Sequence, residues 1–108
     1  MPSTTISRGN ILLNMILGVS LTPTALVAST TTAQNFTVPG LQLFDVITIN
    51  LNGAQTAGVG IVNAYVSAAN IMTVVFSNST AGTPTPAAGT YVLTVDRSEY
   101  QPLPTNAL

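Results

Sequence analysis

Residues 36–97, FTVPGLQLFDVITINLNGAQTAGVGIVNAYVSAANIMTVVFSNSTAGTPTPAAGTYVLTVDR, decide the fold of this chain. The segment is a succession of short apolar runs separated by glycine, proline and asparagine. In the run 45–51, Ile47, Ile49 and Leu51 fall on one face, which is the period-two pattern of a half-buried strand. The segment contains no stretch with the 3.6-residue period of a helix. It therefore predicts an all-β domain.

A β-hairpin is predicted in the middle of this segment. The runs 61–67 and 71–77 are separated by Ala68, Ala69 and Asn70, and asparagine tolerates the positive φ that such a loop needs. Alternation assigns the side chains of these runs, and of the last run at 90–97, to two faces. The residues predicted to point inward are Val62, Ala64, Val66, Met72, Val74, Phe76, Tyr91, Leu93 and Val95, with Asn63 and Tyr65 outside.

The segments on either side are predicted to lie outside the core. Residues 1–18 turn from polar to apolar at Ile11, but the apolar run is far shorter than the roughly 20 residues that span a bilayer. A cleaved signal peptide is the alternative for this segment, although Asn14 interrupts its apolar run. We expect an N-terminal arm over 1–18, a β domain over 19–97 and a proline-containing tail over 98–108.

The spacing of the runs gives the fold class. About six or seven strands, each about five to eight residues long, follow one another with turn residues between them. This pattern is typical of a sandwich or barrel. We predict a single antiparallel β-sandwich or jelly-roll-like barrel with an extended N-terminal arm and a short C-terminal tail.

The composition is unusually poor in charge. Charged residues make up 5% of the 108 residues, against about 25% in an ordinary soluble domain. Two arginines cannot form the cationic surface that nucleic-acid binding requires, so no nucleic-acid or membrane partner is expected. A surface near zero net charge promotes association, which favours a protein that functions within an assembly. The alternative is a small neutral domain that its threonine, serine and asparagine keep soluble.

Catalytic chemistry is not expected. The chain has no histidine, cysteine or lysine, the usual proton carriers and nucleophiles near neutral pH. Its carboxylates are Asp45, Asp96 and Glu99, and an acid–base pair of Asp45 and Asp96 is less plausible than two solvated strand ends. Calcium is the one metal to consider, through Asp45, Asn50 and Asn52, but the spaced acidic residues of calcium loops are missing. We expect no enzyme activity, no cofactor and no metal.

Three pieces of the sequence resemble a small β domain of structural proteins of tailed bacteriophages: PGLQLFDVITIN, AGVGIVNAYVSAANIMTVVFSNSTA and PAAGTYVLTVDR. In that pattern a PGL turn leads to an aspartate before a strand, and a Pro-x-x-Gly-x-Tyr segment introduces a last strand that ends in arginine. The chain departs from the pattern at Phe44, where a glycine is expected, and at Tyr65, where an arginine is common. The matching positions are Asp45, Val66-Ser67-Ala68, Phe76, Asn78, Pro86, Gly89, Tyr91 and Arg97.

The resemblance implies a virion component, in particular a capsid decoration or cement protein on the capsid exterior. Its partners would be the major capsid protein and further copies of itself, as a dimer or trimer. One alternative is a tail-fibre or tail-tip module that recognises a host glycan through residues 80–89 and Tyr65. Another is a secreted adhesin or surface-layer fragment from which residues 1–18 are cleaved.

Contacts to the capsid or to other subunits are predicted to rest on apolar side chains. Burying one leucine or isoleucine contributes about 1.5–3 kcal/mol, whereas an exposed ion pair of Arg8 would contribute about 0–1 kcal/mol. Deleting residues 1–17 is expected to leave a folded β domain that no longer attaches. The predicted contact residues are Ile11, Leu12, Leu13, Met15, Ile16 and Leu17 in the arm, with Tyr65 and Tyr100.

Overall fold

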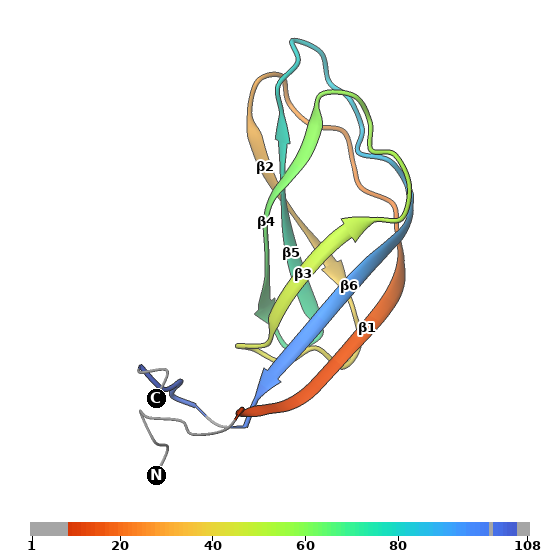
Figure 1. Ribbon diagram of the computed structural model, residues 1–108. Coiled ribbons are helices and arrows are strands. Elements are labelled where there is room, and N and C mark those ends of the chain that lie inside the picture. Colours follow the sequence, from red (N-terminus) through yellow and green to blue (C-terminus); the bar gives the residue numbers. More distant parts are fainter. Residues whose placement is uncertain (1–8, 100, 106–108) are drawn as a thin grey trace.

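A computed structural model describes residues 9–99 and 101–105 of the chain. In this part the chain forms six strands and no helix, so none of the described residues belongs to a helix that could cross a membrane. The strands are β1 (Ile11–Leu21), β2 (Thr31–Thr37), β3 (Val46–Leu51), β4 (Val59–Ala68), β5 (Ile71–Asn78) and β6 (Gly89–Ser98). They make two antiparallel sheets, β1–β6–β3 and β2–β5–β4, packed face to face (Figure 1). The predicted all-β sandwich is confirmed.

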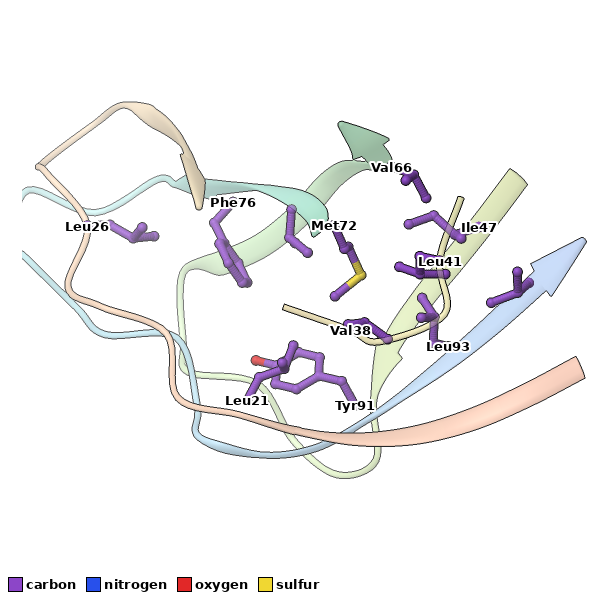
Figure 2. Close-up of a cluster of buried hydrophobic side chains, with 12 residues drawn as sticks. Leu21, Leu26, Val38, Leu41, Ile47, Val66, Met72, Phe76, Tyr91 and Leu93 are labelled. Atoms are coloured by element: carbon purple, nitrogen blue, oxygen red, sulfur yellow. The ribbon is translucent and has the colours of Figure 1, made fainter. Parts of the chain in front are cut away.

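The core lies between the central strands of the two sheets. A central strand has a neighbour on both sides, so its inward side chains are fully covered. Figure 2 shows these side chains meeting between the sheets. The alternation predicted for both strands is confirmed, because the residues with no exposed surface include Met72, Val74 and Phe76 from β5 and Tyr91, Leu93 and Val95 from β6.

The first strand corrects the predicted arm. Residues 11–18 belong to β1, which pairs antiparallel with β6 from Ile11 opposite Ser98 to Leu21 opposite Gly89. The β domain therefore begins at Ile11 rather than at residue 19, and its last strand ends at Ser98. Leu21 ends the strand, so the strand expected from residue 19 onward is the end of β1. Residues 1–8 of the predicted arm lie outside the described residues.

A β-bulge changes the expected faces of β4. Ile61 pairs with Phe76 and Asn63 pairs with Val75, which leaves Val62 as an extra residue in the ladder. Such a residue shifts the alternation by one position. Ile61 consequently packs against the core, whereas Val62 is 59% exposed. The prediction that Val62 points inward is wrong, and the predictions for Ala64 and Val66 are confirmed.

The β4–β5 hairpin and the segment before β3 close one end of the sandwich. Asn70 adopts a φ of 65°, as predicted for the turn. Its backbone NH donates to the carbonyl of Leu41, and its carbonyl accepts from the NH of Val38. Val38 and Leu41 are buried, and Figure 2 shows both side chains pointing into the core. This turn therefore fixes the position of the segment that leads into β3.

Candidate interaction surface

A partly buried ion pair joins the residue before β3 to the end of β6. The guanidinium of Arg97 donates from Nε to Oδ1 of Asp45 and from Nη2 to Oδ2, at 2.8 Å in each case. The Asp45 side chain is 2% exposed and that of Arg97 is 20% exposed. Two parallel hydrogen bonds of this kind fix geometry as well as charge. Both residues are positions of the phage-like sequence pattern, and the structure brings them together.

The same carboxylate holds the turn that precedes β3. Oδ2 of Asp45 accepts from the NH of Gln42 at 2.9 Å, and the NH of Asp45 donates to the Gln42 carbonyl at 3.0 Å. Arg97 also donates from Nη2 to the carbonyl of Gly40 at 3.0 Å. The Asn70 side chain completes this network, because its Oδ1 accepts from the NH of Gly40 at 2.8 Å. The turn is therefore fixed at both ends by side chains of other strands and turns.

This turn presents two large apolar side chains to solvent. Leu43 is 51% exposed and Phe44 is 64% exposed. Phe44 has a φ of 75°, in the left-handed region that a residue with a Cβ atom rarely adopts. Backbone strain of this kind is characteristic of functional positions, where the surrounding structure enforces it.

Further exposed apolar residues lie beside the turn. Val46, the first residue of β3, pairs with Asp96 of β6, and Ile11, the first residue of β1, pairs with Ser98 of β6. Both residues therefore lie beside the C-terminal end of β6, at one end of the sandwich (Figure 1). Leu12 follows Ile11 at a bulge in the β1–β6 ladder. We call this set the apolar pole: Ile11, Leu12, Leu43, Phe44 and Val46, each more than half exposed.

The acidic side chains near the apolar pole are held by different hydrogen-bond partners. The Arg97 guanidinium lowers the pKa of Asp45, chiefly through their hydrogen bonds, so Asp45 stays ionised near neutral pH and has no proton to donate. Asp96 accepts a hydrogen bond from the Asn14 side chain on the outer face of the sheet. Asp45 and Asp96 thus lie at the same end of the sandwich but have different partners.

Two of the calcium ligands considered in the sequence are far apart in the structure. Asp45 and Asn50 are separated by five residues of extended chain, about 16 Å, which is too far for one calcium ion to join them. Within residues 9–99 and 101–105, no group of three or more acidic residues is placed to hold a metal, and no pocket is present.

The predicted contact residues divide according to the face of β1 on which they lie. Ile11, Leu12 and Ile16 are exposed, with Ile16 at 72%. The other three pack against the core, so the expectation that they lie outside the β core is wrong. They are Leu13, Met15 and Leu17. Tyr100 lies outside the described residues.

Tyr65 and residues 80–89 belong to parts of the fold other than the apolar pole. Tyr65 is 46% exposed on β4, opposite Thr73 of β5. The loop after β5 is held to its neighbours by backbone hydrogen bonds, including one from the NH of Leu26 to the carbonyl of Pro84. The Thr56 hydroxyl donates to the carbonyl of Thr85, and Pro86 is fully buried. This loop therefore belongs in large part to the fold.

Leu43, Phe44 and Val46 are the residues of this surface that the sequence did not predict as contacts, and only Phe44 carried a local signal. The sequence contained a signal, because Phe44 stands where the phage-like pattern has a glycine. A glycine position often requires a positive φ, and the structure has that φ with a phenylalanine in place.

The chain matches no protein-family model, no curated protein and no solved structure. The fold and the exposed side chains define a small β-sandwich domain with an apolar end.

Proposed function

We propose that this protein is a non-enzymatic structural component of a phage virion that decorates an icosahedral capsid and stabilises it by bridging capsid subunits. The apolar pole is the observation that carries the proposal. It presents five large apolar side chains at one end of the sandwich, and the Asp45–Arg97 ion pair fixes the turn that carries Leu43 and Phe44. Burying such side chains at an interface is favourable, and a side chain on a rigid turn loses little conformational entropy when it binds.

The sequence resemblance supports the same function. The positions that match the phage-like pattern maintain the fold and carry no chemistry. Tyr91, for example, is fully buried, and its hydroxyl donates to the carbonyl of Ala87 at 2.8 Å. Asn78 accepts from the NH of Thr80 and donates to the carbonyl of Val27. Such residues suit a scaffold whose surface makes the functional contacts.

The proposed contact surface has fewer residues than the one expected from the sequence, and some of them differ. Within β1 it retains Ile11 and Leu12, and it adds Leu43, Phe44 and Val46. The partner is the major capsid protein on the exterior of the shell. Attachment depends on apolar burial rather than on charge, so about 1 M salt, which reduces the screening length to about 3 Å, should not detach the protein.

Copy number is the first test of this function. Virions of the phage that encodes the chain are purified, and the protein is quantified against the major capsid protein. Hundreds of copies per virion are expected for a capsid decoration protein. A handful of copies would indicate a tail-tip module, and complete absence from virions would refute any virion role.

A binding test addresses the apolar pole itself. Virions that lack the protein are mixed with wild type, with the Phe44→Gly variant, or with a Val62→Ala control, whose altered side chain is equally exposed on β4. Loss of the phenylalanine should weaken attachment at least tenfold, since burying it contributes about 1.5–3 kcal/mol. The control should bind like wild type. Equal binding of all three proteins would contradict a role for the pole.

A further inference from the structure

The two flanks of the sandwich are closed to different extents. On one flank the edge strands β3 and β4 pack against each other. On the other flank the edge strands are β1 and β2, and they have no substantial contact. Figure 1 shows β1 as the outer strand of its sheet, with β6 beside it on one side only. This open flank is the feature from which the inference starts.

The inward side chains of β1 are incompletely covered at the open flank. Met15 pairs with Val95 of β6, and Leu17 pairs with Leu93. Val95 and Leu93 have no exposed surface, whereas four inward residues of β1 before Leu21 are only partly buried. The partly buried side chains are Leu13, Met15, Leu17 and Val19. An additional strand beside β1 would cover them.

The edge of β1 lacks the features that normally prevent strand pairing. Natural edge strands are protected by charged side chains, prolines, bulges or short length. Over its 11 residues β1 contains no charged residue and no proline, and its one irregularity is the bulge at Leu12 near its start. Residues 13–21 therefore offer a regular, uncharged edge.

We propose that β1 pairs antiparallel with β1 of a second copy of this chain, about a two-fold axis at Ile16. The two sheets then form one continuous six-stranded sheet. In this register the inward Met15 lies opposite the inward Leu17 of the second copy, so apolar side chains meet. On the outer face Ile16 meets its own counterpart, and Asn14 lies opposite Gly18. No charged pair is buried or opposed in this strand pairing.

The size of the flank suits a second copy. At about 3.3 Å per residue β1 is about 36 Å long, and the molecule is 22 Å across its narrowest axis. The outline of the flank is thus on the order of 800 Å², large enough for an interface of standard size, to which each partner contributes about 800 Å². This inference does not rest on attachment to a capsid. The apolar pole and the edge of β1 around Ile16 are tested by different variants.

The test uses the purified full-length chain without virions. Sedimentation equilibrium over about 1–100 μM, a range that includes the weakest affinities of standard-size interfaces, should show a dimer for wild type. The Ile16→Lys variant, in which like charges would face each other across the two-fold axis, should raise the dissociation constant at least tenfold. Because Ile16 is 72% exposed, its replacement should leave the fold intact. Val62→Lys is the matched control on the edge strand β4 and should dimerise like wild type.

A cross-linking experiment fixes the register. The chain has no native cysteine, so Ile16→Cys introduces a single thiol whose Cβ should lie about 4.5–5.5 Å from its counterpart. With oxidised glutathione it should form a covalent dimer, and Val62→Cys should not. A monomeric wild type throughout the concentration range, a trimer, or a dimer that Val62→Lys breaks and Ile16→Lys does not, would overturn the proposal.

Discussion

Phe44 combines an exposed apolar side chain with a backbone conformation that suits glycine. A left-handed residue with a Cβ atom costs about 1–2 kcal/mol, and glycine at the same position loses about 0.5–1 kcal/mol through its greater freedom in the unfolded chain. Phe44→Gly is therefore expected to raise the free energy of unfolding by about 0.5–1 kcal/mol, measured by urea denaturation. Phe44→Ala retains the Cβ atom and should show no such gain. A glycine variant less stable than the alanine variant would contradict this account.

This prediction separates stability from function at one residue. If Phe44 is retained for binding, the glycine variant is more stable and attaches less well. A loss of attachment in that variant cannot be ascribed to unfolding.

The Asp45–Arg97 pair predicts how stability depends on pH. Arg97 lowers the pKa of Asp45 below its ordinary value of 3.8. As the pH falls below that value, the unfolded chain takes up the proton before the folded protein does, so protonation favours unfolding. The contribution of the pair is complete above pH 3.8 and is lost as the pH falls through the lower pKa of the folded state. Urea denaturation at pH 7 and pH 3 measures this loss.

Arg97→Met tests the same pair from the other side. The variant leaves a buried carboxylate without its partner, which is expected to cost about 3 kcal/mol at pH 7. Protonation of Asp45 removes that unpaired charge, so the difference from wild type should narrow at pH 3. A difference that stays constant between the two pH values would show that the ion pair is not its cause.

At the level of the strands, alternation predicted the central strands correctly and the edges incompletely. Met72, Val74 and Phe76 alternate with residues that lie on the outer face of β5, so the pattern indicates the buried face directly. In β1 the contrast between faces is weak, because Leu12 and Ile16 are exposed while Leu13 is packed against the core. Apolar residues on both faces of an edge strand resemble an irregular apolar segment, which is why the sequence suggested an arm.

The bulge in β4 and the apolar pole could not be predicted for a different reason. A bulge depends on how two strands pair, and the pattern of one strand contains no sign that Val62 is extra. Leu12 lies at the same end of the sheet as Phe44 and Val46 because β1 and β3 both pair with β6. A single sequence does not give this strand order. Only the missing glycine at Phe44 marked the site locally.

The position of β1 in the sheet reverses the expected result of an N-terminal truncation. Deleting residues 1–17 removes most of β1 and leaves one edge of β6 without its neighbouring strand, beside Leu93 and Val95. The loss of three partly buried side chains should be on the order of 4 kcal/mol, a large part of the 5–15 kcal/mol that stabilises a typical domain. Urea denaturation followed by circular dichroism should therefore show a weakened or absent cooperative transition. Deleting residues 1–8 retains every described strand and should retain the transition.

For the whole molecule, dimerisation through β1 predicts that thermal stability depends on concentration. A partner that binds only the folded chain stabilises it by mass action. The melting temperature of wild type should rise as the protein concentration increases from about 1 to 100 μM, and that of Ile16→Lys should not. Melting temperatures that are independent of concentration in both proteins would contradict the coupling between folding and association.

The pairing of β1 with β6 also affects folding during synthesis, because β1 must wait for β6. Among the six described strands, β1 is synthesised before the others, and β6, its partner in the same sheet, is synthesised after them. At about 5–20 residues per second, the intervening chain takes several seconds to emerge. During that interval the nascent segment ILLNMIL is apolar, has no sheet partner and carries no charge to discourage aggregation. The nascent chain should therefore depend on a holding chaperone until Ser98 has left the exit tunnel.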